Sequence, residues 1–338
     1  MLIIFRLVVS MWYDKREQLL RSGLWYSFSG GANIIIPVIS YGIGHIKSDS
    51  LRSWQWMYLI AGAITCLWSI IIFLLFPDSP LSAKGFTDQE RALIQRRMQA
   101  DNAGTLNRRF KLPHVLECLG SVTFWVVNLM SMLTSVVSGP ISSFGSLIFS
   151  DMGFNKEQAL LLNIPNGAMA FFCILTSATL GRKIPNIRLF VVMTACLMVV
   201  LGCCLAWQLP TANNAGRLAG FYMMNFFSSA YVQVIGFGTS NVGGYTKKAT
   251  SSAGIFVFYC LGNIAGPLIF NRKDAPRYDP GFMGTMICLA VCFGLALLLR
   301  LHLARKNVHR DRDNGPAGTE HGLDDITDKE NKDFRYQL

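Results

Sequence analysis

Charged residues are scarce in this sequence. Asp, Glu, Lys and Arg make up 15% of the 338 residues, whereas a soluble globular chain carries about 25%. The shortage is concentrated in eight stretches that contain none of the four residue types, and each could cross a bilayer as a helix of about 20 residues. The stretches are Ser22–Gly44, Ser53–Pro77, Cys118–Ser150, Gln158–Gly181, Leu189–Gly216, Leu218–Thr246, Ala249–Asn271 and Pro280–Leu299. The pattern predicts an all-α polytopic membrane protein with eight transmembrane helices and excludes a soluble enzyme.

Other absences exclude further classes of function. The eight stretches hold no ionisable acid or base that could serve an intramembrane enzyme, so no catalytic residue is expected. The nine cysteines show no paired Cys-x-x-Cys spacing and no Cys/His cluster, so no metal site is expected. No glycine-rich phosphate loop is present, which excludes an ATP-driven pump within this sequence. We therefore expect no cofactor.

The positive charge follows the loops between the stretches. The formal net charge is +11. When alternate loops are assigned to opposite sides of a membrane, one side collects 23 Lys and Arg residues and the other collects 7. Such a bias is typical of cytoplasmic loops in membrane proteins. The positive charge is thus explained by orientation in a membrane, with both chain ends in the cytoplasm. We therefore expect the lipid bilayer, and not nucleic acid, as a partner.

Polar side chains recur in some stretches at steps of three and four residues, which places them on one helical face. The second, fifth and eighth stretches lack such a face and are expected to face lipid. A repeat of three helices is typical of transporters, so the polar faces suggest a substrate cavity. The cavity candidates are Asn33, Asn128, Ser135, Asn166, Asn225, Tyr259 and Asn263. Alternatively, each of these side chains only holds helices together.

Helix-breaking residues lie inside four of the stretches. A proline removes a backbone hydrogen bond and bends its helix, and such breaks often line the cavity or gate of a transporter. The hinge candidates are Pro37, Gly139, Pro140, Pro165, Gly266 and Pro267. Static kinks are the alternative, because glycine and proline are frequent in membrane helices.

Several short segments between residues 7 and 305 are distinctive in combination. They are Met11–Gln18, Ser40–Gly44, Trp54–Met57, Pro77–Pro80, Asn241–Lys248, Gly262–Pro267 and Asp274–Tyr278. Together, and in this order, they resemble the allantoate permease family, which is the anion:cation symporter branch of the major facilitator superfamily. The resemblance implies that the eight spans match helices five to twelve of a twelve-helix bundle, and that the chain is N-terminally incomplete.

The resemblance also implies a division of the chain. Residues 1–77 would be a remnant of the N-terminal half, with the end of one helix and two further spans. Residues 78–117 would form a cytoplasmic loop, in which Thr87 and Glu90 make a capping box at the start of a short helix. Residues 118–305 would form a six-helix bundle, and the polar residues 306–338 are predicted to be a disordered tail.

Members of the family import small organic anions, such as ureido acids and vitamin carboxylates, together with protons. The resemblance therefore implies a transporter of such anions, in the plasma membrane, with the anion and protons as its partners. A carboxylate normally calls for an Arg or Lys in the cavity, and none of the eight stretches has one, so the family's functional residues are not carried over. The alternative hypothesis is a membrane protein that does not transport, acting as a nutrient receptor or descended from a transporter by decay.

Overall fold

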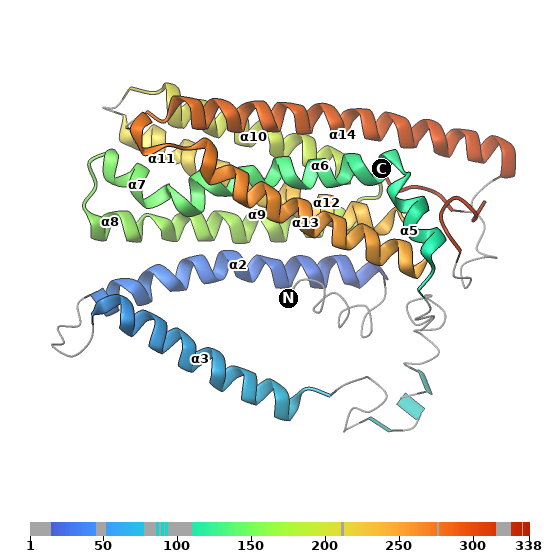
Figure 1. The fold of residues 1–338 in the computed structure, drawn as a ribbon, viewed down its shortest axis with the longest axis horizontal. Helices are drawn as coiled ribbons and strands as arrows, with labels where there is room; N and C mark the ends of the chain where they lie inside the picture. Colours follow the sequence, from blue (N-terminus) through green and yellow to red (C-terminus); the bar gives the residue numbers. More distant parts are fainter. Residues whose placement is uncertain are drawn as a thin grey trace.

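The computed structural model describes residues 15–44, 52–77, 86–87, 89–90, 92–93, 110–210, 213–275, 277–315, 326–332 and 334–338. Their regular secondary structure is helical, and the long helices run roughly along one axis (Figure 1). The first two helices are α2 (Lys15–Gly44) and α3 (Ser53–Leu75). The remaining α-helices are α5 (Leu112–Leu119), α6 (Val122–Val136), α7 (Gly145–Asp151), α8 (Lys156–Leu161), α9 (Asn163–Lys183), α10 (Arg188–Gln208), α11 (Asn214–Met223), α12 (Phe227–Ser240), α13 (Tyr245–Ile269) and α14 (Asp279–Asn314).

Three short elements interrupt this series where the helical winding changes. The π-helix η1 (Gly139–Ser143) follows α6, and the 3₁₀ segment η2 (Met224–Phe226) separates α11 from α12. A second 3₁₀ segment, η3 (Arg272–Asp274), precedes α14. Local changes of winding at mid-span often mark functional positions in helices, so η1 and η2 are relevant to the site.

Six helical segments of the described residues are long and apolar enough to cross a membrane, whereas the sequence predicts eight. The six are Trp54–Leu75, Val122–Ser143, Lys156–Lys183, Arg188–Gln208, Tyr245–Ile269 and Asp279–Asp313. The predicted span Leu218–Thr246 is divided by η2 into helices of 10 and 14 residues. The predicted span Ser22–Gly44 lies in α2, which has 30 residues but carries a polar face of Ser, Asn and Gly. The count of eight spans is therefore not confirmed.

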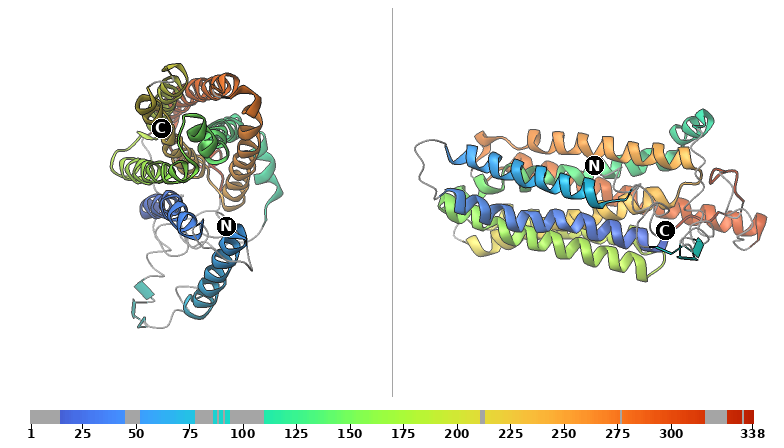
Figure 2. Two further views of the ribbon diagram at one scale, coloured as in Figure 1. Left: turned by 90° about the vertical axis from the view of Figure 1, so that its left-hand side faces the viewer. Right: turned by 90° about the horizontal axis from the view of Figure 1, so that it is seen from below.

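The helix α2 packs lengthwise against α9, whereas α3 projects away from the bundle (Figures 1 and 2). The α2–α9 approach is close because glycines meet there: a Cβ on Gly30 would lie 2.8 Å from the carbonyl oxygen of Gly167. None of the side chains in the apolar span of α3 is buried. An all-apolar helix surface of this kind can face lipid tails at no polar cost.

The helix α10 differs from the expectation that the fifth stretch is peripheral. Its exposed face includes Leu197, which is 56% exposed, but Val199 on the opposite face is fully buried. This buried face lies against α11, α12 and α14. In a membrane, an apolar side chain meets equally apolar surroundings in lipid and in protein, so an all-apolar sequence does not by itself place a helix at the periphery.

The C-terminal residues also differ from the expectation of a disordered tail after residue 305. The helix α14 continues to Asn314, and residues 326–332 and 334–338 make hydrogen bonds with helix ends. In the predicted loop, the capping box is present, because the Thr87 amide donates to Glu90 over 2.9 Å and the Glu90 amide donates to Thr87 over 3.4 Å. The helix end expected at the start of residues 1–77 lies outside the described residues.

Candidate functional site

Three tyrosines from three helices meet where α2 joins the rest of the bundle. The ring of Tyr231 on α12 stacks on Tyr259 on α13 with 4.6 Å between centroids, and it lies 5.5 Å from the ring of Tyr26 on α2. The cluster therefore combines aromatic faces with hydroxyl groups where α2 contacts α12.

A pair of asparagines lies at the break between α11 and α12. The Asn225 side chain, on η2, donates to Asn166 Oδ1 on α9 over 2.8 Å and to the Tyr222 carbonyl over 3.0 Å. Both asparagines are buried. The amide nitrogen of Asn166 has no hydrogen-bond partner among the described residues, and neither does either side-chain atom of Asn128 on α6. A buried amide left unpaired costs about 1–3 kcal/mol, so these groups are suited to receive water or a polar solute.

The candidates on α6 and α13 fall into two kinds. Asn263 joins the two helices, because its Oδ1 accepts from Ser138 over 2.6 Å and its Nδ2 donates to the Tyr259 carbonyl over 2.9 Å. Ser135 instead donates to the Ser131 carbonyl of its own helix over 2.7 Å. The side chain of Asn33 is exposed on α2, although its backbone packs against Gly167, the residue after Asn166. The structure thus brings Asn263 and Tyr259 together and leaves Asn33 outside the group.

Sequence reasoning did not select Gln233, although it shares the polar face of Asn225. Its Nε2 donates to the Ser177 carbonyl over 2.6 Å and to the Ser177 hydroxyl over 2.9 Å. Ser229 donates to the Cys173 carbonyl over 2.8 Å. These bonds fix α12 to α9 and are the kind of contact that holds membrane helices together. The sequence signal for these residues was their spacing from Asn225, which places them on the same helical face. That spacing does not distinguish a side chain that holds helices together from one that lines a cavity.

Four of the six hinge candidates come together at one helix crossing. A Cβ on Gly139, the first residue of η1, would lie 2.6 Å from the backbone nitrogen of Pro267 and 2.9 Å from the Cα of Gly266. Pro140 follows directly and is buried. The backbones of η1 and α13 therefore touch where both helices lose regular hydrogen bonds, because a proline has no amide proton to donate.

The other two hinge candidates lie elsewhere. Pro165 is the third residue of α9, after the break from α8, and its missing amide proton accounts for that break. Pro37 is buried inside α2. Neither residue is part of the crossing between η1 and α13.

The tyrosines, asparagines and serines described above form a central group of neutral polar side chains. Hydroxyls and amides come from α2, α6, α9, η2, α12 and α13, and no ion pair occurs among them in the described part of the chain. Ion pairs lie instead at the two ends of the bundle. Arg277 pairs with Asp279 at the start of α14. Lys247 pairs with Glu117 and Asp328 where α5 and the start of α13 meet, which is called the charged end below (Figure 1). The arrangement provides a neutral centre between ionised ends.

The family model of the Major Facilitator Superfamily matches residues 1–267. The chain belongs to this superfamily. The superfamily that the short segments indicated is therefore confirmed. A crystal structure of the superfamily transporter FucP in its outward conformation matches with a TM-score of 0.60 and 16% identity, over 87% of this chain and 71% of that one. That likeness supports the fold.

The sequence is also similar to individual transporters. It is 31% identical to the allantoate permease of Saccharomyces cerevisiae, over 99% of this chain and 64% of the permease. It is 31% identical to the MFS-type transporter cnsL of Penicillium expansum, over 98% of this chain and 68% of that one. An uncharacterized transporter of Schizosaccharomyces pombe, C757.13, is 29% identical over 98% of this chain and 64% of its own length. The chain thus spans a little under two thirds of several of its curated relatives.

Proposed function

We propose that the protein transports small organic anions of the allantoate, ureidosuccinate and vitamin-carboxylate class across a membrane in symport with protons. The observation that carries the proposal is the similarity to a yeast allantoate permease. The neutral hydroxyls and amides on α9, η2, α12 and α13 support it, because they can donate hydrogen bonds to carboxylate and ureido oxygens. The substrate-binding group then comprises Asn128, Asn166, Asn225, Tyr259 and Asn263.

We further propose that α2 and α3 belong to one half of the transporter and that α6 to α14 form the other. In this arrangement the cavity lies between the halves, where alternating access opens it to each side in turn. The close backbone contacts between η1 and α13 then act as the hinge of the second half. Opening at a glycine contact costs little packing, because no side chain has to leave its neighbours.

A chimaera tests the transport function. The chain would replace the matching part of the yeast allantoate permease, so that the permease supplies the portion that has no counterpart here. We expect cells that produce the chimaera to take up labelled allantoate or a related ureido acid saturably, and faster at acid external pH. Uptake that stays at the level of untransformed cells for a panel of small carboxylates would contradict the proposal.

Matched variants test the substrate-binding group. Asn166→Ala and Asn263→Ala should each lower kcat/KM of the chimaera by roughly 10-fold or more, because each removes a hydrogen bond and leaves its partner unpaired. Asn33→Ala is the control, since that side chain is exposed on α2 and outside the group. Equal uptake by all three variants would leave Asn166 and Asn263 as structural residues only.

The orientation can be tested separately. The bias of 23 Lys and Arg on one side against 7 on the other supports a cytoplasmic position for the end that holds α5 and the end of α14. The plasma membrane is proposed from the resemblance to the permease family alone. An epitope inserted after Gly315 should be hidden from antibody on intact cells and become reachable after permeabilisation. Labelling of intact cells would reverse the proposed orientation.

A further inference from the structure

A buried lysine at the charged end of the bundle is held by two carboxylates from distant parts of the chain. Lys247, in the first turn of α13, is 2% exposed. Its Nζ lies 2.8 Å from Glu117 Oε1 on α5 and 2.6 Å from Asp328 Oδ1. Removing a buried charge from its partners is costly. The carboxylate of Asp328 is therefore a substantial part of what holds Lys247 in place.

The Asp328 carboxylate occupies a site that would suit any carboxylate. Oδ1 accepts from Lys247 and from the backbone amide of Gly243 over 3.3 Å, while Oδ2 accepts from the Tyr336 hydroxyl over 2.9 Å. Two of these three donors belong to the loop and helix of the bundle and not to the C-terminal residues. A lysine ammonium with a backbone amide beside it is a common arrangement for binding an anion.

The residues that carry Asp328, 326–332 and 334–338, are called the C-terminal segment below. Its final residues are held by paired hydrogen bonds. Asn241 and Gln337 exchange two bonds, of 2.9 and 2.6 Å, and Asn307 and Tyr336 exchange two, of 2.7 and 2.9 Å. The Leu338 amide donates to Asn186 Oδ1 over 3.0 Å. These bonds join the segment to the ends of α12 and α14 and to the connection between α9 and α10.

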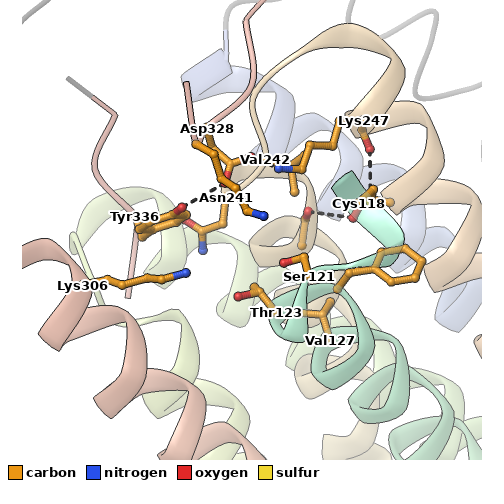
Figure 3. Close-up of a pocket in the computed structure, with 14 residues that line it drawn as sticks. Cys118, Ser121, Thr123, Val127, Asn241, Val242, Lys247, Lys306, Asp328 and Tyr336 are labelled. Atoms are coloured by element: carbon orange, nitrogen blue, oxygen red, sulfur yellow. Dashed lines mark hydrogen bonds and ion pairs between the residues drawn. The ribbon is translucent and has the colours of Figure 1, made fainter. Parts of the chain in front are cut away.

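A pocket lies beneath the C-terminal segment (Figure 3). Asp328 and Tyr336 form one wall, and the hydroxyl residues Ser121 and Thr123 line another. Lys306 also lines the pocket, and its Nζ lies 5.5 Å from the centre of the Tyr336 ring. No described carboxylate forms an ion pair with Lys306 or with the neighbouring Lys329. The pocket therefore has more cationic than anionic groups around it and would attract an anion.

We propose that this pocket is a carboxylate-binding site that the chain fills with its own Asp328, and from which a free small carboxylate displaces the C-terminal segment. The exchange replaces one carboxylate by another on Lys247 and the Gly243 amide, so the buried lysine is never left without its partner. Displacement would free the ends of α12 and α14 from the segment. The inference goes beyond transport, since it holds whichever solute crosses the membrane.

The concentration needed for displacement follows from the covalent tether. A ligand on the same chain competes at an effective concentration on the order of millimolar. A free carboxylate must reach or exceed that level, so tens of millimolar is about the range to test. Succinate is a suitable probe, and succinamide is its neutral counterpart with the same shape.

Hydrogen exchange of the C-terminal segment provides the measurement. The full chain would be placed in phosphatidylcholine nanodiscs, and deuterium uptake would be followed in the peptide that contains residues 334–338, whose amides donate to Asn307, Asn241 and Asn186. Succinate should speed this uptake several-fold, whereas succinamide and sodium chloride at equal ionic strength should not. Equal uptake in succinate and in sodium chloride would overturn the proposal, and this test requires no variant.

Two substitutions of the same type give the second test. Asp328→Asn keeps the shape of the side chain, removes its charge, and should speed uptake by about tenfold or more, since a charge-assisted bond is lost. Asp313→Asn, at an exposed ion pair with His309 on α14, is the matched control and should change nothing. If Asp328→Asn exchanges as slowly as Asp313→Asn, the carboxylate does not hold the segment and the proposal fails.

The third test locates the anion. Lys306→Gln removes a cation of the pocket that makes no ion pair with a described residue. Because its Nζ also lies 5.5 Å from the centre of the Tyr336 ring, the effect of succinate is measured against this variant's own exchange without succinate. The concentration of succinate needed for half of the effect should rise several-fold. An unchanged concentration would place the displacing anion outside this pocket and overturn the assignment.

Discussion

The substitution Gly139→Ala tests whether the contact between η1 and α13 is as close as the structure indicates. The added Cβ would lie 2.6 Å from the backbone nitrogen of Pro267 and 2.9 Å from the Cα of Gly266, whereas ordinary contacts are 3.4–4 Å. Both of these atoms belong to the backbone and cannot rotate away. The helices must therefore separate by nearly 1 Å, which is 3.4 Å less 2.6 Å, or bend by an equivalent amount.

Two effects of Gly139→Ala on the free energy of unfolding oppose each other. Overpacking lowers it, and the better helix propensity of alanine raises it. Overpacking of a well-packed region costs about 1–3 kcal/mol. Replacing a helical glycine by alanine gains about 0.5–1 kcal/mol. Gly294→Ala on α14 isolates the gain, because a Cβ there would meet nothing within 4 Å. The free energies of unfolding of the two variants should therefore differ by about 1–3 kcal/mol, with Gly139→Ala the less stable.

Thermal unfolding in detergent, followed by tryptophan fluorescence, measures this difference. Gly294→Ala should unfold at the wild-type temperature or slightly above it, and Gly139→Ala should unfold several degrees lower. Identical midpoints for the two variants would refute the close contact and, with it, the assignment of this crossing as the hinge. In the chimaera, Gly139→Ala should also slow uptake with little change in KM, because it affects the moving backbone and not the substrate-binding group.

Three further substitutions test other parts of the structure. Val199→Ala should lower the free energy of unfolding by about 1–3 kcal/mol, because the substitution leaves a cavity. Leu197→Ala, at an exposed position, should leave the free energy of unfolding nearly unchanged. Equal effects in the same thermal assay would contradict the burial of one face of α10. Asn225→Leu should lower the free energy of unfolding by about 1–3 kcal/mol, because Asn166 loses its partner. The double variant with Asn166→Leu should recover part of that loss. Strictly additive losses would show that the two asparagines are not coupled. Lys247→Gln should destabilise the protein by about 3–5 kcal/mol, because it leaves two carboxylates facing a neutral side chain, and an unchanged midpoint would mean that the lysine is solvated.

The membrane architecture was largely predictable because apolar length is a strong signal. The predicted span Ser53–Pro77 contains α3, and the predicted span Pro280–Leu299 lies inside α14. The signal fails where the helix changes its winding. Asn225 and its neighbours in η2 form a 3₁₀ turn inside an uncharged stretch, and hydropathy does not register a change of backbone hydrogen bonding.

The polar candidates were recognised as a group, but their pairing was not. Asn166 and Asn225 are 59 residues apart and meet through the packing of α9 on η2. Helical periodicity gives the face on which each residue lies and says nothing about which helix covers that face. The same limit explains why Asn33 was selected together with Asn263, although only Asn263 joins another helix.

The C-terminal segment was the largest departure, and its composition explains the error. It belongs to residues 306–338, which are rich in charged and polar side chains, and such residues are typical of disorder because they bury little apolar surface. Its order depends instead on specific partners: Asp328 meets Lys247 across 81 residues of sequence, and Gln337 meets Asn241 across 96. Polar contacts at such separations leave no local pattern. They are found only when the structure brings the two parts of the chain together.

The separation of a neutral centre from a charged end has a consequence for binding. A neutral hydrogen bond contributes about 0.5–1.5 kcal/mol net, so four such bonds to a carboxylate give about 2–6 kcal/mol. A dissociation constant of about 1 mM corresponds to about 4 kcal/mol. Donors such as Asn166, Tyr259 and Asn263 would therefore hold an anion weakly enough to release it. A lysine buried at the same place would bind it more tightly and slow its exit. Lys247 instead lies at the end of the bundle, where the chain supplies Asp328 as its partner. In the proposed transporter, a solute at the centre would therefore meet neutral donors from the described helices, with Lys247 and its carboxylates at the end of the bundle.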